Sequence, residues 1–134
     1  MISYAQNFED VILERVLNEQ KEGFYVDVGA MDPIDMSVTK HFDERGRRRG
    51  NIEPVPRFHA ALVKDRPRDV NLCLALGKSH DKLTIYDFET QGVSILSPEF
   101  ADYFIQKNRR YRRRPVAVRG QVKNIDEGLT VSHR

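Results

Sequence analysis

An aspartate and a glycine lie close together in residues 24–33, and their types and spacing could support ligand binding. Asp27 lies within a short apolar run typical of a buried strand, and Gly29 follows where the chain must turn. Because glycine lacks a Cβ atom, the backbone there could approach a ligand closely. The first strand-to-helix turn of an open parallel sheet often forms the floor of a ligand crevice. The pattern is compatible with a nucleotide-type site, but taken alone it is a weak signal, because a glycine after a strand is common in any α/β protein.

A second carboxylate, that of Glu53, follows the glycine turn by about twenty residues, the spacing found in nucleotide-binding sheets. At the end of a second parallel strand, such a carboxylate can accept hydrogen bonds from the hydroxyls of a ribose. The alternative is a surface acid in front of a turn at Pro54. Together, Gly29 and Glu53 are more informative than either residue alone, but their spacing only suggests a ribose-containing ligand and leaves the surface acid as the alternative.

The elements that would position these residues alternate between helices and strands. A capping box of Ser3 and Gln6 predicts an amphipathic helix that ends near Gly23, and residues 24–28 form the first strand. A second helix is predicted from a cap at Asp35 to residue 44. Its apolar face and the glycine expected to stop it are Val38, Phe42 and Gly46.

The second strand is expected to be short or frayed, because Arg47, Arg48 and Arg49 are poor material for a buried strand. A short helix should follow and close at Pro67, and residues 70–76 read as one strand containing a buried Cys73. The remaining predicted elements are a strand at 82–88, a loop at 91–94, a helix at 98–108 and a strand at 115–119. No further core element is expected in residues 120–134.

Length and composition fit one small globular domain of 134 residues, with 40% hydrophobic and 31% charged residues. No apolar run is long enough to span a bilayer, and the first residues do not resemble a secretory signal. We therefore expect a cytoplasmic protein. The four histidines and the single cysteine show no metal-ligand spacing, so no metal site is predicted. Nucleophile-elbow and phosphate-loop motifs are also absent.

The positive charge is concentrated in one segment. Residues 107–119 hold seven of the 22 Lys and Arg residues, so the other 15 face 20 acidic residues and the rest of the chain has a net charge of −5. The segment, with its arginine run at 109–114, could hold an anionic partner or form a solvated loop. A nucleic acid, held through the arginines and Tyr111, is the less favoured of these alternatives.

Several segments of the chain, in order and spacing, resemble the FkbM-type S-adenosylmethionine-dependent methyltransferases. The resemblance covers about residues 3–96. The segments are residues 3–10 (SYAQNFED), 23–30 (GFYVDVGA), 51–54 (NIEP), 66–69 (RPRD), 75–77 (ALG) and 92–94 (GVS), with Asp32, Pro33, Ser37, Thr39, Asn71 and Leu72 between them.

The resemblance implies a Rossmann-like methyltransferase fold that binds S-adenosylmethionine. Asp27, Gly29 and Ala30 would line the methionine side of the cofactor, Glu53 would hold the ribose, and Ala75 and Leu76 would lie near adenine; Asp32 belongs to the same set. The family implies methyl transfer to a hydroxyl of a sugar or similar small acceptor. Such an in-line displacement depends mainly on holding the acceptor oxygen about 3 Å from the methyl carbon, aided by a general base that the sequence does not identify.

The chain departs from the family in two places. Residues 46–50 (GRRRG) lack the usual aromatic and apolar residues, and residues 120–134 lack the acidic strand motif of the later family segment. We therefore expect a single partial domain over 1–134: a helix in 1–23, a cofactor-binding portion in 24–96, and a helix, basic loop and divergent tail in 97–134. Half of the parallel sheet would be missing, so a further C-terminal portion or a partner chain is expected. Activity of the chain alone is uncertain, and the alternative is a non-catalytic module that holds an anionic partner through residues 107–119.

Overall fold

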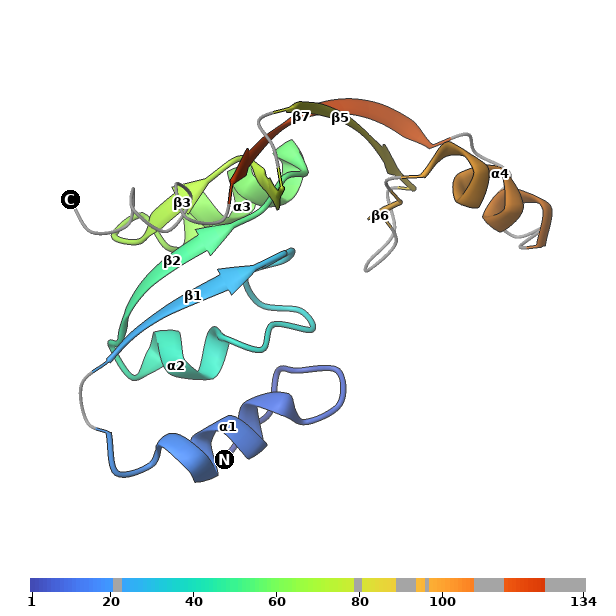
Figure 1. The fold of residues 1–134 in the computed structure, drawn as a ribbon. Helices are drawn as coiled ribbons and strands as arrows, with labels where there is room; N and C mark the ends of the chain where they lie inside the picture. The colour runs from blue at the N-terminus through green and yellow to red at the C-terminus, as the bar shows by residue number, and fades with distance from the viewer. Residues whose placement is uncertain (21–22, 79–80, 89–93, 96, 108–114, 125–134) are drawn as a thin grey trace. The chain divides into compact units, whose positions relative to one another are not determined.

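The chain is a mixed α/β protein with two compact units (Figure 1). The computed structural model describes residues 1–20, 23–78, 81–88, 94–95, 97–107 and 115–124. Its contacts cluster into Met1–Cys73 and Leu74–Arg134. The expectation of one partial domain over 1–134 stays a prediction, because two compact units can belong to one domain. The expected arginine run at 109–114, the tail at 125–134 and most of the glycine loop at 91–94 lie outside the described residues.

The first unit contains a three-stranded parallel sheet. Its strands are β1 (Phe24–Val28), β2 (Arg48–Ile52) and β3 (Val70–Leu72), in the order β1-β2-β3. Helix α2 (Lys40–Glu44) connects β1 to β2, and α3 (Pro56–Asp65) connects β2 to β3. Since the strands are parallel, with Val28 paired to Ile52, their carboxyl ends lie at the same edge of the sheet. The sequence prediction of the first strand is confirmed.

Strand β2 is the central strand of this sheet, and the prediction that it would be short or frayed is wrong. Arg49 is only 8% exposed, yet it forms ion pairs with Asp43 and Asp69, the latter at 3.3 Å. Its Nη2 also donates to the backbone oxygen of Asp43 at 2.8 Å. A buried charge is tolerated when it is paired and hydrogen-bonded, and these two carboxylates meet that condition. Asn51, fully buried on the same strand, donates to Asp69 and Asn71.

Helix α1 (Glu9–Leu17) is attached through its polar residues, and the predicted capping box is wrong. The Ser3 hydroxyl donates to Asp10 Oδ1 at 2.6 Å, and Phe8 occupies the N-cap position without a side-chain cap. Asp10 is fully buried and also accepts from the backbone of Tyr4 at 2.8 Å. The apolar residues Ile12 and Val16 are 60% and 74% exposed. The side of the helix with the buried carboxylate therefore anchors residues 3–5.

Helix α2 is shorter than predicted. Thr39 takes the N-cap position, and Asp35 lies in the preceding turn instead of capping the helix. The predicted stop is confirmed, since Gly46 has a φ of +76° and its N–H donates to the Asp43 backbone oxygen at 2.9 Å. Residues 29–39 are therefore a long connection between β1 and α2 and do not form a helix from residue 35.

The predicted single strand at 70–76 consists of two short strands in different sheets. Strand β3 ends at Leu72, and β4 (Ala75–Gly77) belongs to the second unit. Cys73 lies between them and is exposed, so the prediction of a buried thiol is wrong. Alternation of apolar residues continues through the break, and for this reason the sequence pattern does not reveal it.

The second unit contains a four-stranded mixed sheet in the order β4-β7-β5-β6. Strands β5 (Asp81–Asp87) and β7 (Val116–Asn124) pair antiparallel over seven residue pairs, whereas β4 and β7 pair in parallel. Strand β6 (Ser94–Ile95) pairs with β5, and helix α4 (Pro98–Lys107) follows it. The prediction of no element beyond residue 119 is wrong, because β7 continues through Gly120 to Asn124. The sheet of the first unit is thus parallel, whereas that of the second unit contains both parallel and antiparallel pairs.

Replacing Gly77 with alanine is expected to lower the free energy of unfolding by about 1–3 kcal/mol, because overpacking forces neighbouring atoms to shift. A Cβ at this position would lie 2.7 Å from Val122 Cγ1. Urea denaturation of Gly77→Ala and of Gly23→Ala provides the measurement and its control, since a Cβ at Gly23 would meet nothing within 4 Å. Adding Val122→Ala should recover part of the loss; additive losses in the double variant would contradict the clash.

Candidate functional site

The candidate site begins where β1 and β2 end. The N–H of Gly29 donates to the Ile52 backbone oxygen at 2.8 Å, and that of Ala30 donates to the same oxygen at 3.3 Å. Gly29 has a φ of +77°, which glycine adopts without strain, and a Cβ there would meet nothing within 4 Å. The turn after β1 is therefore tied to the end of β2, with open space beside Gly29.

Glu53, the first residue after β2, joins this turn to the next loop. Its Oε2 accepts from the N–H of Met31 and its Oε1 from the N–H of Val55, each at 2.8 Å. The side chain is only 2% exposed, and burial raises the pKa of this carboxyl although the two backbone donors oppose the shift. Met31 has a φ of +52°, an uncommon conformation for a non-glycine residue, which the hydrogen bond to Glu53 helps to hold.

Asp27 is held by a short chain of hydrogen bonds. Its Oδ2 accepts from the Thr39 hydroxyl at 2.6 Å, and Arg66 Nη1 donates to the same hydroxyl oxygen at 3.0 Å. Burial raises the pKa of Asp27, and the Thr39 hydrogen bond and the Arg66 charge act in the opposite direction. The Thr39 hydroxyl thus lies between the Arg66 guanidinium and the Asp27 carboxylate and forms a hydrogen bond with each of them.

Arg66 is the residue that the sequence analysis did not identify as part of the site. It is 2% exposed, and its Nη2 donates to the Pro33 backbone oxygen and, at 3.1 Å, to Ser37 Oγ. Its Nε lies 3.8 Å from Asp65 Oδ2. One guanidinium therefore contacts residues 33, 37 and 39 and holds the connection between β1 and α2. A signal for Arg66 in the sequence is the segment 66–69, which resembles the corresponding segment of the methyltransferase family.

The structure brings five of the seven predicted site residues into the first unit. Besides Asp27, Gly29 and Glu53, Ala30 is buried, with 7% exposure, and Asp32 Oδ1 accepts from the backbone of Ile34 and Asp35, each at 2.9 Å. Asp32 thus stabilises a turn next to the glycine. The other two predicted residues, Ala75 and Leu76, lie in β4 of the second unit.

At this edge of the sheet, the carboxylate oxygens of Asp27 and Glu53 can accept hydrogen bonds, and Gly29 is exposed nearby. Each oxygen of an ionised carboxylate can accept about two hydrogen bonds, so Glu53 has capacity beyond its two backbone donors. Asp27 offers a second, half-buried carboxylate at the end of β1. These groups fit a ligand with hydroxyl or ammonium donors. Within the described residues, no group of three or more His, Cys, Asp and Glu side chains could hold a metal ion.

Comparisons with protein-family models, with curated proteins and with solved structures find no match to this chain. The resemblance to the FkbM-type methyltransferases thus rests on the sequence segments alone. In the part of the chain that the structure describes, no helix is both long and apolar enough to cross a membrane.

Replacing Asp27 with asparagine is expected to change the pH dependence of stability. Because the folded state raises the pKa of Asp27 above its ordinary value of 3.8, it keeps a proton that the unfolded chain has lost. The free energy of unfolding of the wild type should therefore fall, relative to that of Asp27→Asn, as the pH rises from the ordinary pKa of an aspartate to the raised pKa of Asp27. Urea unfolding of both proteins between about pH 3.5 and 7.5 measures the difference. A wild-type advantage that grows with pH would contradict the raised pKa.

Proposed function

We propose that the carboxyl edge of the first sheet binds S-adenosylmethionine and that the chain is the cofactor-binding part of an O-methyltransferase. The observation that carries this proposal is the hydrogen bond between Met31 N and Glu53 Oε2, which puts the glycine turn and the predicted ribose acceptor side by side. In an open α/β sheet, ligands bind outside the carboxyl ends of the strands. Two residues that are distant in sequence thus meet where such a site would be.

The topology of the first unit supports the proposal. Its parallel strands in the order β1-β2-β3 correspond to the 3-2-1 half of a doubly wound sheet. In such a sheet β1 would be central, and a strand on its other side would complete the crevice. Strand β1 lies at the edge of the described three-stranded sheet and pairs with β2. A further chain portion or a partner chain would supply the strand on its other side.

The proposed roles follow from what each residue offers. Asp27 would face the ammonium group of the methionine portion, the open space at Gly29 would admit it, and Glu53 would accept from the ribose hydroxyls. S-adenosylmethionine supplies an electrophilic methyl group for a hydroxyl acceptor, such as a sugar. The chain's own contribution is to bind and orient, and no residue is assigned as the general base.

Calorimetric titration with S-adenosylhomocysteine tests the proposal. We expect saturable binding that changes little between about 50 and 500 mM salt, since it depends on hydrogen bonds and few net charges. The control is the same titration with homocysteine alone, which lacks the ribose and should bind much more weakly. No binding by a chain that unfolds cooperatively would contradict a working cofactor site.

A further inference from the structure

The mixed sheet of the second unit has one face directed to its core. Ile85 of β5 and Val122 of β7 are 1% and 7% exposed, and Gly120 is buried between its neighbours on β7. Because side chains alternate along a strand, residues 83, 85 and 87 of β5 share this face with residues 116, 118, 120 and 122 of β7. The other residues of the two strands must therefore form the opposite face.

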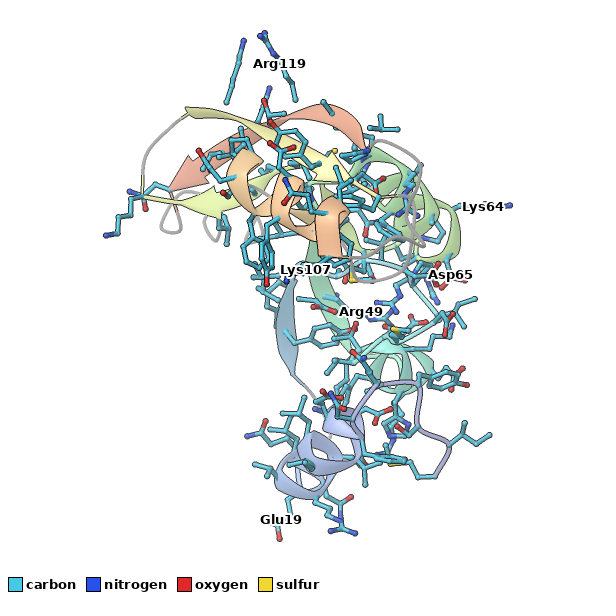
Figure 2. The ribbon with its side chains drawn as sticks, turned by 90° about the vertical axis from the view of Figure 1, so that its right-hand side faces the viewer. Glu19, Arg49, Lys64, Asp65, Lys107 and Arg119 are labelled. Atoms are coloured by element: carbon cyan, nitrogen blue, oxygen red, sulfur yellow. The ribbon has the colours of Figure 1, made fainter. Side chains whose placement is uncertain are left out.

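The opposite face is basic. Lys82 pairs with Gln121, so Arg119 and Lys123 are its diagonal neighbours on β7, at about 7–8 Å. Lys82 and Arg119 are exposed and Lys123 is half-buried. The Arg119 side chain extends away from the sheet (Figure 2). Asp87, an acidic residue of β5, is 3% exposed and lies on the core face.

The same face contains an aromatic ring and neutral polar groups. Tyr86, which is half-buried, pairs with Ala117, whose small side chain is exposed. Thr84 pairs with Arg119, and both side chains are exposed. Cations, one aromatic ring and hydrogen-bonding side chains thus lie within two adjacent strands.

We propose that this face, defined by Lys82, Thr84, Tyr86, Arg119, Gln121 and Lys123, binds single-stranded nucleic acid. Three cations can neutralise successive phosphates, and Tyr86 offers a surface on which an unpaired base can stack. An acidic protein would use the cations but would gain little from a ring beside an alanine. The charge and the aromatic group together favour a nucleic acid over other polyanions. This proposal does not depend on the cofactor site.

The strand pairing changes the interpretation of the basic segment 107–119. Its sequence places Arg119 with the arginine run, where a nucleic acid was not the favoured partner. In the structure, Arg119 lies within β7, next to Lys82 of β5. Residues that are far apart in the sequence therefore form the basic face, and this grouping requires the β5–β7 register.

Fluorescence anisotropy with a labelled oligothymidylate of twelve nucleotides tests the proposal on the full chain. The triple variant Lys82→Gln, Arg119→Gln, Lys123→Gln should bind at least about tenfold more weakly and show a log–log salt slope shallower by about 2, since each phosphate contact contributes about 0.7. Tyr86→Leu should weaken binding about tenfold with an unchanged slope, and Tyr86→Phe should bind like wild type. Cooperative urea unfolding of every variant verifies the fold.

Two comparisons can overturn the proposal. The charge-matched control, with exposed cations of the first unit replaced, is Arg48→Gln, Lys64→Gln, Arg68→Gln, and its slope should stay near that of wild type. A second triple, Arg110→Gln, Arg112→Gln, Arg113→Gln, removes charge from the arginine run. If only this second triple weakens binding, the sheet face is not the site. If a polyglutamate of equal charge competes as well as the oligothymidylate, the face is not specific for nucleic acid.

Discussion

Replacing Arg66 with methionine is expected to lower the free energy of unfolding by about 3–5 kcal/mol, because it removes one partner of a buried charged network. Methionine keeps most of the side-chain volume, so the loss reports the guanidinium contacts and little cavity formation. The Pro33 backbone oxygen and Ser37 Oγ each lose a donor. The Thr39 hydroxyl, which donates to Asp27, loses the hydrogen bond that it accepts from the Arg66 guanidinium.

Urea denaturation measures the effect, with Arg68→Met as the matched control. Arg68 follows Arg66 by two residues, and its side chain is exposed. The control should therefore change stability by less than about 0.5 kcal/mol. Hydrogen exchange adds a local readout, since the amides of residues 34–40 should exchange faster in Arg66→Met than in wild type. Equal losses in the two variants would show that Arg66 does not hold the connection between β1 and α2.

The part of the fold that the sequence predicted is the part specified by local patterns. The first strand at 24–28, the glycine stop at Gly46 and the helices at 56–65 and 98–107 follow from short apolar runs, caps and prolines. The meeting of Gly29 and Glu53 was also predictable. It needs only two parallel strands of similar length and the rule that their carboxyl ends share an edge.

What could not be predicted depends on side chains that meet across the fold. Arg49 appears unsuitable for a buried strand until Asp43 and Asp69, from different elements, are seen beside it. Asp10 resembles an ordinary acid in the first turn of a helix, but it is fully buried by accepting hydrogen bonds from Ser3, Tyr4 and Val11. In both cases long-range pairing overrides the local preference of a charged residue for solvent.

The contrast between Arg66 and Glu53 shows how the candidate site is organised. Arg66 donates hydrogen bonds to residues 33, 37 and 39 of the connection between β1 and α2. Glu53 accepts from the N–H of Met31 near the start of the same connection. The turn is therefore fixed by two buried, oppositely charged side chains from separate elements. Such support would keep Gly29 and Asp27 in position before a ligand binds, which lowers the entropic cost of binding.

Glu53 therefore has two candidate roles, and Glu53→Ala separates them. Removing the carboxylate leaves the N–H groups of Met31 and Val55 without their acceptor, so the free energy of unfolding should fall by about 2–3 kcal/mol. Glu19→Ala, which removes an exposed acid whose side chain points away from α1 (Figure 2), should have almost no effect. If Glu53 also holds the ribose, the affinity of the folded variant for S-adenosylhomocysteine should fall by about 1–3 kcal/mol, or roughly 5- to 150-fold. Unchanged affinity together with lowered stability would restrict Glu53 to holding the two loops and would leave the ribose to other residues.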